Sequence, residues 1–99
     1  MSTPERTYEE SFARHCESVG VECLKLRIDG RDGFPDRTLL GSGCAIGFVE
    51  FKRPGKVLRP QQRLWKRTLE ALGFPYAIAY SHEDAVAFLD SLLRRDTDA

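Results

Sequence analysis

A chain of 99 residues is long enough for one domain with a single core. Its hydrophobic content of 41% and charged content of 30% are those of a globular protein, so the composition favours neither disorder nor a membrane span. No stretch has the apolar length of a spanning helix, and the polar start over residues 1–6 does not resemble a signal peptide. We expect one cytosolic domain over residues 1–99, with its core over about 7–93 and a frayed tail over 94–99.

The formal net charge is zero, which argues mildly against bulk electrostatic attraction to nucleic acid. The basic residues are nevertheless concentrated in one segment. Between residues 52 and 67 there is no acidic residue, and the basic stripe consists of Lys52, Arg53, Lys56, Arg59, Arg63, Lys66 and Arg67. Such a stripe is typical either of a surface that contacts phosphates or of a solvated helix face.

The three cysteines, at positions 16, 23 and 44, have neither disulfide nor metal-binding spacing. Their number is odd and no pair has the Cys-x-x-Cys spacing, so neither a disulfide framework nor a zinc site is favoured. We expect all three to be buried thiols. His82 has no second His or Cys near it in the sequence, and we interpret it as structural.

The first predicted element is a helix over residues 7–19, with Gly20 as its C-cap. Its apolar positions have helical spacing and are Tyr8, Phe12, Cys16 and Val19. Glu9 lies at the edge of this apolar stripe, whereas Glu10 aligns with Arg14 and points more to solvent. Glu9 is therefore the better candidate for an inward acid, and Glu10 is the alternative.

The next segment alternates as a strand does over residues 21–28, with Leu26 and Ile28 among the apolar side chains of one face. A charged, glycine-rich loop follows over residues 29–33, and we expect it to be mobile. Arg31 in this loop is either a phosphate contact or an ordinary surface residue.

The central element is a strand that starts at Ala45 and ends before Pro54-Gly55. Glu50 and Lys52 lie on one face of this strand, in a segment whose apolar residues predict burial on both faces. A charged pair in such a strand costs free energy unless the protein uses it. Two interpretations fit: a salt bridge at a frayed strand end, or a pair of functional residues.

A second carboxylate precedes this strand in the turn over residues 33–37, where Pro35-Asp36 leads into a strand over residues 38–40. Asp36 lies fourteen residues before Glu50, which leaves room for a hairpin through residues 41–43. Such a hairpin would set the two carboxylates side by side.

The remaining elements are a helix, a strand and a second helix. The apolar stripe of the helix over residues 60–72 consists of Leu64, Trp65, Leu69 and Leu72. Trp65 completes this stripe, so we expect it in the core rather than stacked on a base. A strand over residues 74–80 then precedes an amphipathic helix, at the start of which Ser81 and Asp84 resemble a capping box.

The order helix, strand, hairpin of two strands, helix, strand, helix (α-β-β-β-α-β-α) predicts an α/β domain with a small mixed sheet flanked by helices. Pro35-Asp36, the hairpin and Glu50-Phe51-Lys52 closely resemble the PD-(D/E)xK nuclease signature. One branch of that superfamily, the virus-type replication-repair nuclease (VRR-NUC) module, is also similar around these residues. The similar segments, within about residues 8–93, are Gly33-Phe34-Pro35-Asp36-Arg37, Phe48-Val49-Glu50-Phe51-Lys52 with Pro54-Gly55, and Leu58-Arg59-Pro60-Gln61-Gln62.

The resemblance implies a restriction-endonuclease-like core and a site for Mg²⁺ or Mn²⁺, which prefer hard oxygen ligands. The implied ligands are Glu9, Asp36, Glu50 and the backbone carbonyl of Phe51. The implied catalytic residues are Asp36, Glu50, Lys52 and Gln62. Lys52 would orient or deprotonate the attacking water, and Gln62 would position that water or a phosphate oxygen. In the family pattern a glutamine stands two residues after the proline, which selects Gln62 after Pro60. Gln62 lies one helical turn before Lys66, so we expect it on the polar face of the helix.

The expected function is that of a metal-dependent endonuclease on DNA, selective for Holliday junctions or other branched DNA, and acting as a homodimer. The cellular setting would be the cytoplasm of a bacterium or of a phage-infected host, without a membrane partner. The expected DNA contacts are Arg37, Arg53, Lys56, Arg59, Arg63 and Lys66. One alternative is a nucleic-acid-binding module without catalysis. Such a module would be expected to lack at least one of Asp36, Glu50 and Lys52, and this sequence has all three. Another is a protein-binding adaptor whose carboxylates pair with the basic stripe.

Overall fold

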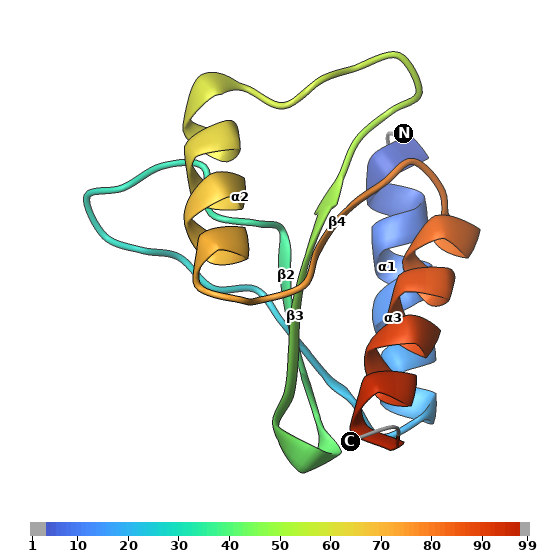
Figure 1. Ribbon diagram of the computed structural model, residues 1–99. Helices are drawn as coiled ribbons and strands as arrows, with labels where there is room; N and C mark the ends of the chain where they lie inside the picture. Colours follow the sequence, from blue (N-terminus) through green and yellow to red (C-terminus); the bar gives the residue numbers. More distant parts are fainter. Residues whose placement is uncertain (1–3, 98–99) are drawn as a thin grey trace.

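The computed structural model describes residues 4–97, which form a four-stranded sheet between two helical layers (Figure 1). The helices are α1 (Pro4–Ser18), α2 (Pro60–Ala71) and α3 (His82–Thr97). The strands are β1 (Glu22–Leu24), β2 (Arg37–Gly41), β3 (Ala45–Phe51) and β4 (Tyr76–Ala79), with a 3₁₀ turn over Ser42–Cys44. The predicted α/β domain with a small mixed sheet and flanking helices is confirmed.

The strands lie in the order β1-β2-β3-β4. The first three are antiparallel neighbours, and β4 runs parallel to β3. Arg37 at the start of β2 is opposite Val49 of β3, so the residue before it reaches the end of β3. This register decides the position of Asp36 relative to Glu50.

Strand β3 is buried on both faces, as its apolar composition predicts. On one face, Val49 and Phe51 belong to a core cluster with Phe12 of α1 and Leu89 of α3. On the other face, Phe48 packs with Trp65 and Leu69 of α2. Figure 1 shows the corresponding layers, with α1 and α3 side by side across the sheet from α2. Trp65 is therefore a core residue, as expected.

Strand β1 is shorter than the predicted segment over residues 21–28. Its register with β2 ends where Leu24 is opposite Thr38. Strand β2 begins at Arg37, so the residues beyond Lys25 have no strand partner there, and Leu26 and Ile28 are exposed. Alternation alone thus predicted eight strand residues where the structure has three, because a strand needs a neighbour for its backbone hydrogen bonds.

The loop over residues 29–33 contacts α2, and its expected mobility stays a prediction. Gly33 has a φ of 89°, and a Cβ at this position would lie 2.7 Å from the backbone carbon of Gln61. The indole Nε1 of Trp65 donates a hydrogen bond to the Asp32 carbonyl at 3.1 Å. The guanidinium carbon of Arg31 lies 4.0 Å from the centroid of the Trp65 ring, which adds a cation–π contact.

Helix α2 buries two of the four residues of the predicted apolar stripe, Trp65 and Leu69. Gln62, Trp65 and Leu69 are buried, whereas Leu64 and Leu72 are exposed. The buried positions follow i, i+3, i+7 spacing, which places Gln62 on the sheet-facing side and not on the expected polar side. Leu64 and Leu72 were predicted to be buried because they are apolar. Gln62 was not, because a buried glutamine requires a hydrogen-bond partner that the sequence does not reveal.

The remaining observations concern the chain end and the three thiols. Helix α3 continues to Thr97, so residues 94–97 of the expected tail are helical, in keeping with the high helix propensity of arginine. Residues 98–99 of the expected tail lie outside the described part of the chain. Of the three thiols expected to be buried, that of Cys16 is buried, that of Cys23 is partly exposed, and that of Cys44, at the end of the 3₁₀ turn, is exposed.

Of the predicted capping box of α3, the bond to the Ser81 side chain is present, whereas the Asp84 side chain bonds the N–H of Tyr80 in place of that of Ser81. Ser81 Oγ accepts a hydrogen bond from the Asp84 N–H at 3.0 Å, and Asp84 Oδ2 accepts one from the Tyr80 N–H at 2.9 Å. Within residues 4–97, no helix has the length and apolar character needed to cross a membrane.

Candidate active site

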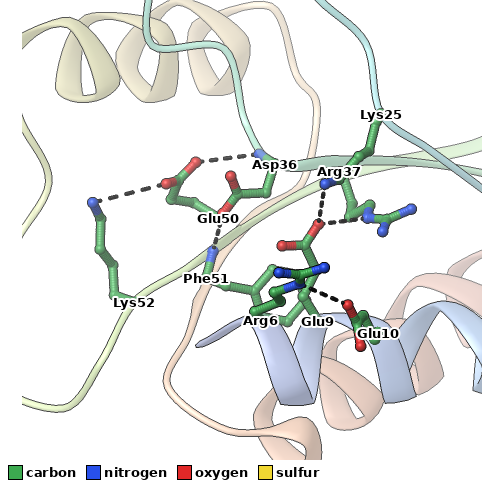
Figure 2. A pocket seen from close by; sticks show the side chains of 9 residues that line it. All are labelled: Arg6, Glu9, Glu10, Lys25, Asp36, Arg37, Glu50, Phe51 and Lys52. Atoms are coloured by element: carbon green, nitrogen blue, oxygen red, sulfur yellow. Dashed lines mark hydrogen bonds and ion pairs between the residues drawn. The ribbon is translucent and has the colours of Figure 1, made fainter. Parts of the chain in front are cut away.

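Asp36 and Glu50 meet where β2 begins and β3 ends. The backbone N–H of Asp36 donates to Glu50 Oε1 at 3.2 Å, and the backbone N–H of Phe51 donates to Asp36 Oδ2 at 2.8 Å (Figure 2). The antiparallel register of the hairpin sets these atoms together, as the sequence predicted. The Glu50 carboxylate is thus oriented by the backbone N–H of Asp36, and the Asp36 carboxylate by the N–H of the residue that follows Glu50.

Two polar side chains complete the surroundings of Glu50. Gln62 Nε2 donates to Glu50 Oε2 at 2.9 Å, and Lys52 Nζ lies 3.9 Å from the same oxygen. Gln62 Oε1 accepts from the Arg59 N–H at 2.8 Å, at the N-terminus of α2. Because that N–H can only donate, it fixes the amide so that its NH₂ group faces Glu50.

Burial dominates the electrostatics of the two carboxylates. Glu50 is only 3% exposed, and burial together with the neighbouring Asp36 raises the pKa of Glu50 to about 8, against the opposing charge of Lys52. Burial also raises the pKa of Asp36, although the hydrogen bond from the Phe51 N–H opposes the change. Buried Glu50 and half-buried Asp36 therefore resist becoming anionic together unless a cation joins them.

A second cluster lies on the α1 side of this pair. Arg37 Nε donates to Glu9 Oε2 at 2.8 Å, and Lys25 Nζ lies 3.5 Å from the same oxygen. The side chain of Glu9 is 13% exposed, whereas that of Glu10 is 49% exposed and pairs with Arg6 Nε at 3.0 Å. Glu9 is thus the more inward of the two acids that the sequence left as alternatives.

Both clusters line one cavity of about 530 Å³. Figure 2 shows Asp36 between the Glu50 and Lys52 side and the Glu9 and Arg37 side. The lining residues are Arg6, Glu9, Glu10, Lys25, Asp36, Arg37, Glu50, Phe51 and Lys52. The four residues expected to bind a metal therefore lie in this cavity, whereas Gln62 supports Glu50 from behind.

The donor chemistry of Asp36 and Glu50 fits a divalent cation, because both are hard oxygen ligands whose burial makes an added positive charge favourable. Within residues 4–97, however, no three His, Cys, Asp or Glu side chains are grouped so as to hold a metal ion. The third acid of the cavity, Glu9, is engaged by Arg37. The fit to a cation therefore depends on Asp36 and Glu50, and the role of Glu9 as a ligand stays a prediction.

The residues expected to contact DNA fall into two groups. Arg37 lies inside the cavity, where its Nη1 also donates to the Cys23 carbonyl at 3.2 Å. The others belong to the loop after β3 and to α2, and of these Arg53, Lys56, Arg59 and Arg63 are exposed and Lys66 is partly exposed. The basic stripe thus continues from Lys52 at the mouth of the site onto the outer surface of α2.

Three site residues were missed by the sequence analysis. Tyr8 donates its hydroxyl hydrogen to the Lys52 carbonyl at 2.7 Å, and Lys25 contacts Glu9. Tyr76 is partly buried, and burial of its hydroxyl together with the charge of Glu50 raises the pKa of that group. Tyr8 and Lys25 belong to predicted elements, but only the packing of α1 and β1 beside β3 reveals their contacts. The position of Tyr76 follows from the pairing of β4 with β3.

A solved structure described as "VRR_NUC domain" matches this arrangement with a TM-score of 0.82. The match covers 90% of this chain and 97% of the other, at 22% sequence identity. The chain has the VRR_NUC fold. The similarity confirms the fold expected from the sequence. No protein-family model and no curated protein matches the sequence.

Proposed function

We propose that this VRR_NUC-fold chain is a metal-dependent endonuclease that hydrolyses DNA phosphodiester bonds. The observation that supports this best is the adjacent pair of half-buried Asp36 and buried Glu50, with Lys52 Nζ 3.9 Å from Glu50, at the wall of a polar cavity. Two carboxylates that favour a shared cation, beside a lysine, are suited to phosphoryl chemistry.

The cation of this proposal is Mg²⁺ or Mn²⁺, held by Asp36, Glu50 and the Phe51 carbonyl, with Glu9 as a further ligand. When bound, such an ion supplies a Lewis acid that stabilises negative charge on the phosphoryl oxygens. Competition from Lys25 and Arg37 for Glu9 makes that residue the weakest of the four ligands.

Lys52 and Gln62 have different roles in this proposal. Lys52 lines the cavity, so its ammonium is available to orient the attacking water and to stabilise the charge that develops on the phosphate. The hydrogen bond from Tyr8 to its backbone carbonyl restrains the Lys52 main chain at the end of β3. Gln62 is only 5% exposed, so it acts by holding the Glu50 carboxylate and not by reaching the substrate.

The substrate of the proposal is branched DNA, bound by a homodimer. Symmetric junctions present two equivalent strands for cleavage, which a twofold dimer with two active sites matches. The basic stripe provides charges for the phosphates on either side of the scissile bond: Arg53, Lys56, Arg59, Arg63 and Lys66, together with Arg37 in the cavity.

The proposal is tested by incubating the protein with single-stranded, duplex, flap and four-way-junction DNA in the presence of Mg²⁺ or Mn²⁺. We expect wild type to cut a branched substrate, and Asp36→Asn and Lys52→Ala to be slower by about 100-fold or more. Arg94→Gln, on the exposed side of α3, should retain wild-type activity.

Folding of each variant is checked by circular dichroism before its rate is compared. DNA binding without cleavage under every metal would overturn the catalytic proposal in favour of a nucleic-acid-binding module. Cleavage of duplex and branched DNA at equal rates would contradict the proposed selectivity alone.

A further inference from the structure

The half of the active-site cavity that adjoins α1 carries more positive than negative charge (Figure 2). Arg37 Nε and Lys25 Nζ lie 2.8 and 3.5 Å from the same oxygen, Glu9 Oε2. Two cations thus share one carboxylate, which leaves one positive charge in excess. The other half has the reverse ratio, because the two carboxylates of Asp36 and Glu50 have one ammonium beside them. One half is therefore suited to a cation and the other to an anion.

The two cations of this half have donors available for an anion. Arg37 donates from Nε to Glu9 and from Nη1 to the Cys23 carbonyl, and its Nη2 donates to no residue within residues 4–97. The planar guanidinium can therefore offer N–H groups to an oxyanion while it stays bonded to Glu9. Lys25 makes only the longer contact with Glu9 among the described residues, and its side chain is 66% exposed.

Glu9 fixes the position of these cations. The side chains of Glu9 and Arg37 are 13% and 14% exposed, so solvent and salt screen their ion pair less than a surface pair. Both cations contact Oε2, which leaves Oε1 for the metal ion of the proposed function. Towards an anion Glu9 is a positioning residue, because it orients the groups that would bind the anion without touching it.

We propose that Arg37 and Lys25 form a subsite for the DNA phosphate next to the scissile one. This inference rests on the proposed function, which places the scissile phosphate at Asp36 and Glu50. Arg37 directly follows Asp36 and lines the same cavity, so a strand lying across the cavity meets the two halves in succession. Lys25 lies outside the basic stripe, so the subsite extends the DNA-binding surface from α2 to the α1 side of the sheet.

The subsite is tested by measuring the affinity of the full chain for a labelled four-way junction and a labelled duplex in EDTA, which prevents metal-dependent cleavage. We expect Lys25→Gln to bind about fivefold more weakly at low salt and to reduce the slope of log affinity against log salt by about one. Arg27→Gln removes an exposed charge two residues further on, outside the cavity, and should bind as wild type does. Equal affinities and slopes in wild type and Lys25→Gln would overturn the subsite.

The position of the subsite is tested by replacing single phosphates of the junction with uncharged methylphosphonates. At one linkage, we expect the replacement to weaken binding by wild type and to have little effect on Lys25→Gln, because the charge and its partner act together. Cleavage of the unmodified junction with Mn²⁺ should occur at the neighbouring linkage. If every replacement affects the two proteins equally, or if cleavage occurs at a distant linkage, the assignment is wrong.

The outcomes separate this subsite from the proposed nuclease activity. The affinities are measured without a metal, so wild type that binds DNA and never cuts it would contradict the nuclease alone. The comparison of Lys25→Gln with Arg27→Gln would still decide the subsite. Wild type that binds neither DNA would overturn both proposals. Both substitutions are at exposed positions, and circular dichroism confirms that each variant is folded before its affinity is compared.

Discussion

At the scale of single residues, Glu50 is the most constrained charge of the domain. It lies on a strand buried on both faces, and both of its oxygens are engaged by the Asp36 N–H, Gln62 and Lys52. Burying a carboxylate costs free energy, and partial pairing does not fully offset this cost. The raised pKa of Glu50 reflects this remaining free-energy cost of ionising a buried carboxyl. The cost falls at the position where a cation is proposed to bind.

The pH dependence of stability follows from this pKa. Glu50 is raised from 4.5 to about 8 in the folded state, so between these values the folded chain binds more protons than the unfolded chain. Stability is therefore greatest at the acidic end of this window and falls as the pH rises through it. Without divalent cations, we expect the urea midpoint of wild type to fall between pH 5 and pH 8.

Glu50→Gln removes the titrating group while keeping its shape. We expect this variant to lose much of the pH dependence and to exceed wild type in unfolding free energy at pH 8 by on the order of 1 kcal/mol. Asp90→Asn, at an exposed position of α3, should retain the wild-type slope. An undiminished slope in Glu50→Gln would show that Glu50 is not the group responsible.

At the scale of elements, the sequence was sufficient for the order of helices and strands and for the hairpin that unites Asp36 with Glu50. Alternation and turn residues are local signals, and these elements depend mainly on them. The ion pair between Arg37 and Glu9 joins residues 28 positions apart, and it depends on how α1 packs beside the sheet. No local pattern contains that information.

The faces of the elements were harder to predict than their existence. Gln62 is a polar residue in the buried stripe of α2, and only its contacts with Arg59 and Glu50 explain its burial. Leu64 and Leu72 are apolar residues that remain exposed on α2 and at its end. Hydrophobicity predicts the average face of a helix, but a functional contact can override it at a single position.

The loop that joins β1 to β2 gives a matched test at this scale. Gly30 and Gly33 both have positive φ, but a Cβ at Gly30 meets nothing within 4 Å, whereas one at Gly33 would contact the backbone of Gln61 and Gln62. We expect Gly30→Ala to cost about 1 kcal/mol of unfolding free energy. Gly33→Ala should cost roughly 1–3 kcal/mol more, because the loop must move off α2.

Chemical denaturation of the two loop variants measures this difference. The same displacement should disturb the capping of α2 by Gln62, so Gly33→Ala should also lower any nuclease activity. Equal destabilisation by both substitutions would mean that the close approach of Gly33 to α2 does not contribute to stability.

At the scale of the whole molecule, the zero net charge conceals an uneven distribution. The stripe from Lys52 to Arg67 contains no acidic residue, and its outer side chains project from α2 and the preceding loop. A surface that binds phosphates through these side chains displaces counterions, so its affinity for DNA should fall steeply with salt.

The salt dependence of binding reports how many phosphates the stripe neutralises. Replacing Arg59 and Lys66 together by glutamine should reduce the slope of log affinity against log salt by about two, close to one for each phosphate that is no longer neutralised. Arg94→Gln serves as the control, since it removes an exposed charge from the opposite helical layer. Unchanged slopes in the double variant would indicate that DNA approaches the domain from another side.

The most direct test of the whole account is binding of the cation itself, because it does not depend on choosing the right DNA. A ligand that binds the folded state alone stabilises it by about 2.7 kcal/mol at a concentration 100 times its Kd. Thermal unfolding of wild type, Asp36→Asn and Asp90→Asn is therefore followed as Mn²⁺ or Mg²⁺ is added. The account predicts a metal-dependent rise in Tm for wild type and Asp90→Asn and little or none for Asp36→Asn. An equal rise in all three proteins, or none in wild type, would contradict a cation site at Asp36 and Glu50.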